Sequence, residues 1–240
     1  MSTRLLTAAA ALTLALTLTE ANASVAVASA AVASPAVAPP AQPSESAQPA
    51  HPAQPTAEIF ATSNTAIITD PDDPRLSTHL RAFEREVRGI IRTNGAAPGS
   101  STLLDGVFWS SDLKQATYER SREFDVNRVS ADGLHHIADL IRKQYHQESV
   151  LTFRFLPTTA PDANAVEIEA PGVTSQRLHD ALLADPVARD ELGGGSVAQD
   201  GRLILIAPVA DLPLTQHLLA ALGVDWTAAT VRYGAEEFVG

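Results

Sequence analysis

Two arginines one residue apart, Arg120 and Arg122, are the residues of this sequence best suited to form a binding site. In an extended strand they share one face with Phe124 and Val126, so two guanidinium groups would lie on a largely apolar surface. Such charges are costly to bury unless a carboxylate or another anion pairs with them. Glu148 is a candidate partner, and the alternatives are a structural ion pair, a β-bulge that changes the face, or a site for an anionic ligand. The predicted ligand-binding residues are Arg120, Arg122, Glu148, Gln147 and Trp109.

A run of three glycines and a serine at 193–196 has the composition of two functional loops but the setting of neither. A phosphate-binding loop follows a strand and opens a helix, whereas this run follows a predicted helix and precedes a strand. A nucleophile elbow needs a glycine two residues after the serine, where Ala198 stands. We interpret the run as a helix end and a strand entry.

The histidines do not form a metal site or a catalytic triad in this sequence. His135 and Asp139 lie one helical turn apart, but His136 points to another side and no His-x-x-x-His pair is present. Ser121 has no histidine near it in the sequence. We therefore predict no catalytic residue, no metal site and no cofactor.

The predicted elements form two stretches with one order: strand, helix, strand, strand, helix, strand. In the first stretch, residues 58–157, Asp72-Asp73-Pro74 predicts a helix start and Asn94-Gly95 its end. Strands are expected at 103–109 and 116–126. The polar residues of the second of these strands share one face: Thr117, Glu119, Ser121, Glu123 and Asp125.

The second stretch, residues 165–240, has the same order in a shorter length. A helix begins after Thr174 and restarts at Asp185-Pro186. An apolar strand follows at 202–209, and a helix then runs from Asp211 to Gly223.

This order is typical of the ferredoxin-like unit. We predict an α+β fold of two tandem ferredoxin-like units with antiparallel sheets, one at 58–157 and the other at 165–240. The sequence leaves open whether the two units join in one barrel or form two separate sheets.

Three short blocks lie between Ser101 and Leu151: Thr102-Leu103-Leu104-Asp105-Gly106 with Trp109, then Glu119-Arg120-Ser121-Arg122, then Tyr145 with Gln147-Glu148-Ser149-Val150-Leu151. In order and spacing they resemble a family of small exported bacterial proteins that is classed as a domain of unknown function. The first strand lacks the aromatic-glycine ending of that family, and the second stretch has no counterpart in it. The resemblance covers about fifty residues and implies no activity.

The N-terminal part of the chain has the layout of an exported protein. Met1–Arg4 is positively charged, Leu5–Leu18 is uncharged and rich in leucine, and Ala21-Asn22-Ala23 offers a cleavage site, which predicts a signal peptide at 1–23. The uncharged run is short for a membrane-spanning anchor, the alternative. Residues 24–57 are rich in alanine and proline and predict a disordered tether.

Charge and composition limit the function classes. The net charge is −11, and because residues 1–56 hold one arginine and two glutamates, the remaining 184 residues carry −10. This balance argues against nucleic-acid partners and against anionic lipid, and the absence of cysteine means that disulfides do not stabilise the protein. No insertion into the membrane is expected once the signal peptide is removed.

We therefore predict a secreted or cell-envelope-associated protein that acts as a non-catalytic binding or interaction module for an extracellular ligand or an envelope partner. The alternative is an enzyme that resembles the dimeric α+β barrel proteins, with a site between the two sheets and oxygenase, isomerase or haem chemistry. A cavity between the sheets that is lined by histidine or tyrosine and by converging polar groups would favour the enzyme.

Overall fold

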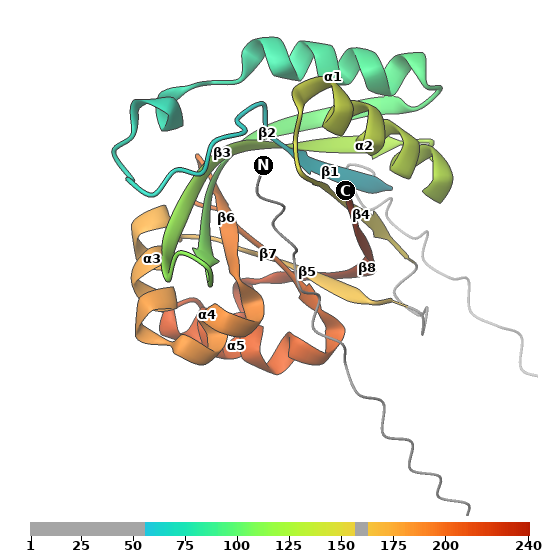
Figure 1. The fold of residues 1–240 in the computed structure, drawn as a ribbon. Coiled ribbons are helices and arrows are strands. Elements are labelled where there is room, and N and C mark those ends of the chain that lie inside the picture. The colour runs from blue at the N-terminus through green and yellow to red at the C-terminus, as the bar shows by residue number, and fades with distance from the viewer. Residues whose placement is uncertain (1–55, 157–162) are drawn as a thin grey trace, which may run out of the picture. The chain divides into compact units, whose positions relative to one another are not determined.

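The computed structural model describes residues 56–156 and 163–240 of the chain (Figure 1). The predicted signal peptide at 1–23 and almost all of the predicted tether at 24–57 lie outside these residues and stay predictions. No helix in the described part is long and apolar enough to cross a membrane.

The described residues form eight strands, five α-helices and three short 3-10 helices. The strands are β1 (Ala57–Ala61), β2 (Ala97–Ser110), β3 (Gln115–Asn127), β4 (Val150–Phe155), β5 (Ala165–Ala170), β6 (Gly194–Ala198), β7 (Leu203–Pro208) and β8 (Thr230–Val239). The α-helices are α1 (Arg81–Thr93), α2 (Ala131–Tyr145), α3 (Ser175–Ala184), α4 (Pro186–Leu192) and α5 (Leu212–Ala221). The 3-10 helices are η1 (Pro74–Ser77), η2 (Val209–Asp211) and η3 (Trp226–Ala228).

All eight strands belong to one closed barrel. They hydrogen-bond in the order β1-β3-β2-β6-β7-β5-β8-β4, and β4 pairs with β1 to close the sheet. The prediction of two tandem ferredoxin-like units is therefore wrong, because β2 pairs with β6 and β4 pairs with β8 across the two stretches. In a separate four-stranded sheet β2 and β4 would be unpaired edges, and the cross-pairing satisfies their backbone groups.

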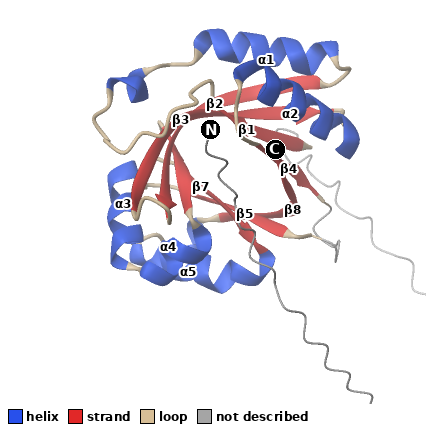
Figure 2. Cartoon of the chain, viewed as in Figure 1, coloured by secondary structure: helices blue, strands red, loops and turns tan. Residues whose placement is uncertain are grey.

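Helices cover the outside of the barrel on two sides (Figures 1 and 2). α1 and α2 lie over β1–β4, where Phe83, Ile137 and Phe124 belong to one buried apolar cluster. α3, α4 and α5 lie over the strands of the second stretch, where Leu178 and Leu218 belong to another. Each strand therefore has one face toward the helices and one toward the barrel interior.

The helix predicted between Asp72 and Gly95 is divided in two. Asp73 caps η1, its carboxylate accepting a hydrogen bond from the Arg75 amide at 2.8 Å. α1 begins only at Arg81, after Leu80, which has a left-handed backbone with φ of 47°. The N-cap position of α1 is therefore Leu80, whose side chain cannot accept a hydrogen bond from the helix.

The two stretches join at two strand pairs, β2–β6 and β4–β8, which we call seams. Each seam contains a glycine that allows close approach of the backbones. A Cβ atom on Gly194, at the β2–β6 seam, would lie 2.7 Å from Cα of Phe108, and the φ of Gly194 is 143°. A Cβ on Gly234, at the β4–β8 seam, would meet the carbonyl oxygen of Arg154. Glycine at these positions lets the strands of the two stretches pair.

We expect Gly194→Ala to lower the free energy of unfolding by about 1–3 kcal/mol, because the new methyl group would force the β2–β6 seam apart. The matched control is Gly89→Ala on α1, where a Cβ would have no atom within 4 Å. That change should raise stability by about 0.5–1 kcal/mol, because alanine favours the helix. Urea unfolding of the two variants measures both effects, and equal stability of Gly194→Ala and the wild type would contradict this role of the seam.

Candidate functional site

The barrel interior holds most of the buried charge among the described residues. On β3, Phe124 and Val126 pack under α1 and α2, so Glu119, Ser121 and Glu123 point to the other face, into the barrel. The polar face of this strand, which is visible in the sequence, therefore faces the barrel interior and not solvent.

One part of the interior is a charge network around Arg232 of β8. Its guanidinium group pairs with Glu58 of β1 at 3.0 Å and with Glu169 of β5 at 2.6 Å. It also forms a close ion pair with Glu167 of β5. The same group lies over the ring of Phe155, 4.0 Å from its centroid. Arg232 thus joins three carboxyl groups from two strands of different stretches.

A second arginine extends this network. Arg202, just before β7, pairs with Glu123 at 2.9 Å and with Glu169 at 3.2 Å. Carboxyl groups outnumber guanidinium groups in this region, and Glu58 and Glu167 are 1% and 0% exposed. Burial of so many unbalanced negative charges would be very costly, so protonation of some carboxyl groups is expected.

The pKa shifts follow from this arrangement. Burial, with the Glu167 carboxyl group beside it as the second cause, raises the pKa of Glu58 to about 11. Burial also raises the pKa of Glu167, and it raises the pKa of Glu123 to about 7 in spite of the nearby Arg202. At neutral pH the network therefore retains protons that exposed carboxyl groups would have lost.

Glu58, Glu123 and Asp125 bring carboxylate oxygens within 4.8 Å of one another, a spacing that a metal ion could bridge. The chemistry of the surroundings does not favour a metal. Arg202 and Arg232 already supply positive charge to Glu123 and Glu58, and the high pKa of Glu58 means that its carboxyl group is protonated at neutral pH. We interpret these residues as part of the charge network.

The other part of the interior is a cavity of about 490 Å³. Its walls are mainly apolar and come from both stretches, with Phe60, Phe108, Leu151, Ile204, Ile206 and Phe238 among the lining residues. The end of α4 and the start of β6, including Gly193–Ser196, also line it. A cavity of this size and lining can hold a small organic molecule.

Three carboxyl groups line this cavity: Glu119 from β3, Glu191 from α4 and Glu236 from β8. Burial raises the pKa of Glu119 and the pKa of Glu236. A carboxyl group in such a setting can accept or donate a proton near neutral pH, which exposed glutamates do poorly. Ser121 and Gln147 add hydroxyl and amide groups to the lining.

Arg120 and Arg122 lie on the outer, helix-facing side of β3, on the face that their spacing predicts. Arg120 pairs closely with Asp105 and donates from Nε to the carbonyl oxygen of Leu76 at 2.5 Å. Arg122 pairs with Glu84 of α1 at 3.2 Å. Their carboxylate partners are thus Asp105, which lies opposite Arg120 on the adjacent strand β2, and Glu84 of the more distant helix α1.

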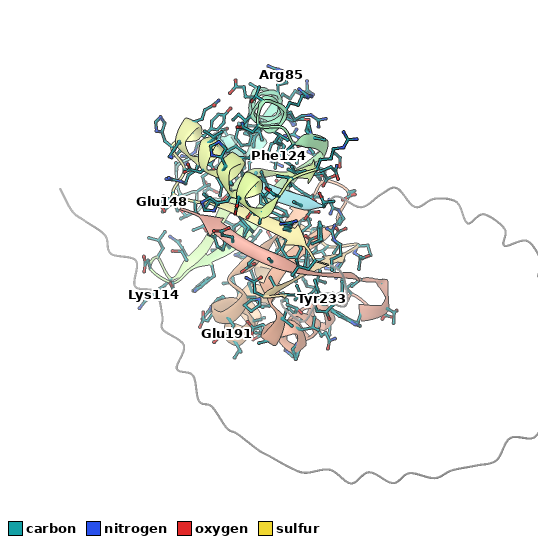
Figure 3. The ribbon with its side chains drawn as sticks, turned by 90° about the vertical axis from the view of Figure 1, so that its right-hand side faces the viewer. Arg85, Lys114, Phe124, Glu148, Glu191 and Tyr233 are labelled. Atoms are coloured by element: carbon teal, nitrogen blue, oxygen red, sulfur yellow. The ribbon has the colours of Figure 1, made fainter. Side chains whose placement is uncertain are left out.

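Glu148, the partner considered from the sequence, is exposed and makes no ion pair with any residue that the structure describes. Figure 3 shows Glu148 at the edge of the molecule, away from Arg85 of α1. Gln147 and Trp109 line the barrel cavity, and Arg189 of α4 stacks on the Trp109 ring at 4.1 Å from its centroid. The structure therefore separates the five predicted ligand-binding residues into an outer group and a cavity group.

The remaining motifs have structural roles. Gly193 ends α4 in a left-handed conformation, and β6 begins at Gly194, as a helix end and strand entry require. His135 on α2 pairs with Glu237 of β8 at 3.0 Å on the exposed surface.

Sequence reasoning did not select Glu58, Glu119, Glu167 or Arg232, which hold the interior together or line its cavity. A signal was present in the alternation of acidic and apolar residues at 116–126 and again at 165–170. Such alternation normally marks a solvent-exposed face, and only closure of the barrel turns that face inward.

No protein-family model matches the chain, and no curated protein matches it. A solved structure of a candidate monooxygenase from Lactobacillus acidophilus NCFM aligns with 77% of this chain and 95% of its own, at 14% identity and a TM-score of 0.23. A likeness at this level carries no argument about function.

Proposed function

We propose that the protein binds a small, largely apolar organic molecule inside the barrel and that Glu119 exchanges a proton with it. The cavity of about 490 Å³ between the strands of the two stretches is the observation that supports this proposal. Its apolar walls would provide most of the affinity, and its few polar groups would orient the ligand.

The proposal adopts the alternative from the sequence, an enzyme with a site between the two sheets. The lining does contain converging polar groups, Glu119, Ser121 and Glu236. It contains neither histidine nor tyrosine among the described residues, so haem ligation by these residues finds no support. Acid–base chemistry at a carboxyl group fits the lining better than chemistry that depends on histidine. Export of the protein remains a prediction from residues 1–23.

The cavity can be tested with N-phenyl-1-naphthylamine, a small apolar probe whose fluorescence rises in apolar surroundings. We expect the wild type to bind it and Ser196→Phe to weaken binding about tenfold or more, because the ring would fill the cavity where Ser196 lines it. Ser111→Phe, in the exposed turn between β2 and β3, is the matched control and should bind as the wild type does. Equal binding by both variants would show that the probe does not enter the barrel.

The role of Glu119 needs a probe that responds to its charge. Above its raised pKa the carboxylate should favour a cationic aromatic amine such as 1-naphthylmethylamine. Glu119→Gln should then weaken binding of this amine about tenfold while leaving N-phenyl-1-naphthylamine, which is uncharged, unaffected. If the variant bound both probes as the wild type does, the cavity would bind ligands without Glu119.

A further inference from the structure

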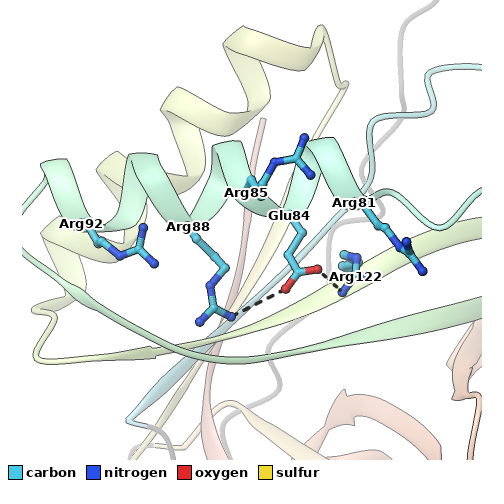
Figure 4. A pocket seen from close by; sticks show the side chains of 6 residues that line it. All are labelled: Arg81, Glu84, Arg85, Arg88, Arg92 and Arg122. Atoms are coloured by element: carbon cyan, nitrogen blue, oxygen red, sulfur yellow. Dashed lines mark ion pairs between the residues drawn. The ribbon is translucent and has the colours of Figure 1, made fainter.

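Four arginines form a line along one side of α1. Arg81, Arg85, Arg88 and Arg92 recur at spacings of four, three and four residues, which places them on one face of the helix. At 1.5 Å per residue the line covers about 16 Å of helix axis. Figure 4 shows these side chains along α1, with Arg122 of β3 beside Glu84.

The arginine line borders a groove of about 510 Å³ between α1 and β3. Five arginines and one glutamate line it, which gives the groove a net charge of +4. Glu84 pairs with Arg122 at 3.2 Å and with Arg88 at 3.7 Å. In the part of the chain that the structure describes, no ion pair reaches Arg81, Arg85 or Arg92. The whole chain carries −11, so this positive surface is a local exception.

Two independent features favour an anion at this place. The Arg122 side chain is 10% exposed. Its two Nη atoms donate to Ser101 Oγ and to the carbonyl oxygen of His79, but its Nε atom is buried without a hydrogen-bond partner. The N-terminus of α1 has no side-chain cap. The amide of Glu84 donates to the carbonyl oxygen of Leu80 at 2.9 Å, but no described residue accepts a hydrogen bond from the amides of the first three residues, Arg81–Phe83. Free amides at a helix N-terminus attract anions, and Arg81 lies at that end of the groove.

We propose that this groove binds an extended chain of linked phosphates laid along α1. A single small anion would reach only neighbouring arginines, whereas a chain could pair with the whole line. Arginine suits phosphate because its guanidinium group donates two parallel hydrogen bonds. The groove and the barrel cavity share no lining residue, so this binding would be a second function, independent of the first.

The surroundings favour a phosphate chain over a nucleic acid or a membrane surface. Single-stranded nucleic acids are bound by aromatic side chains that stack on the bases, and the lining of this groove holds no aromatic residue. A helix that lies on a membrane inserts large apolar side chains, and none of the exposed large apolar residues of the described part is on α1.

Calorimetric titration with sodium tripolyphosphate and with a medium-chain polyphosphate tests the proposal. The wild type should bind the longer chain more tightly, with an affinity that falls as salt rises. The double variant Arg85→Gln/Arg88→Gln should weaken polyphosphate binding about tenfold or more and reduce the salt slope by about two, one for each lost contact. Circular dichroism of this variant checks that the exposed and half-exposed positions tolerate the change.

Two single variants complete the design. Glu84→Gln removes the one carboxylate of the groove and should tighten binding several-fold, which a merely destabilising change would not do. Lys143→Gln on α2 makes the same change in net charge as the loss of one arginine but lies outside the groove, and should leave binding unchanged.

Wild-type affinity for polyphosphate in the double variant would overturn the proposal. So would tighter binding of oligothymidylate, or of phosphatidylglycerol vesicles, than of polyphosphate. Equal affinity for the short and long chains would overturn the extended mode.

Discussion

Arg232→Ala is expected to lower the free energy of unfolding at neutral pH by about 3–5 kcal/mol, because it strands buried carboxyl groups. Arg232 contacts Glu58, Glu167 and Glu169 inside the barrel, and the first two are almost completely buried. Urea unfolding followed by circular dichroism measures the change.

The control for this variant is Arg75→Ala. Arg75 also pairs with a carboxylate, Asp73, but the pair lies on the surface, with the Arg75 side chain 49% exposed. Loss of this exposed pair should change the stability little. Acid should partly rescue Arg232→Ala, because protonation removes the stranded charge. If Arg232→Ala lost no more stability than Arg75→Ala, the barrel interior would tolerate the Glu58 and Glu167 carboxyl groups without Arg232.

The stability of the wild type is expected to fall as the pH rises from about 5 to about 8. Burial raises the pKa of Glu123 to about 7 and that of Glu58 to about 11. The folded protein therefore holds protons that the unfolded chain has already released. The stabilisation that these bound protons provide is complete below the pKa of the carboxyl group in the unfolded chain. It is lost as the pH rises through the pKa of that group in the folded protein. For Glu123 alone the loss is about 3 kcal/mol across this window.

Glu123→Gln should reduce the slope of this dependence between about pH 5 and pH 7, because glutamine resembles the protonated acid and does not titrate, while Glu58 continues to contribute. Glu148→Gln is the control, since Glu148 is exposed and has no ion pair with a described residue. Urea unfolding at several pH values compares the slopes. A wild type whose stability rises with pH would show that the interior carboxyl groups are charged in the folded state.

The helices and their ends were largely readable from local sequence. Ser130 caps α2 by accepting a hydrogen bond from the Gly133 amide, and Asp185 caps α4 before Pro186. Apolar residues at spacings of three and four gave α1 its buried face, with Phe83, Val87 and Ile91 in the core. These signals depend on residues within one helical turn of each other, so they can be recognised in the sequence alone.

The candidate sites depended on contacts between distant segments. The spacing of Arg120 and Arg122 correctly predicts that both lie on the helix-facing side of β3. Their partners, Asp105 and Glu84, follow from how β2 and α1 pack against that strand. The break at Leu80 was also unforeseen, although it sets where the arginine line of α1 begins.

The sequence by itself determined the alternation of each strand, and with it which residues share a face. Only the tertiary structure decided what each face meets. Pairing of β2 with β6 and of β4 with β8 closes the barrel, and closure makes an interior of the face that carries Glu58, Glu119 and Glu123. Whether two sheet edges pair depends on twist and on close approach at Gly194 and Gly234, which join residues far apart in the chain. Local periodicity carries no information about such pairing, so it could not distinguish two separate sheets from one barrel.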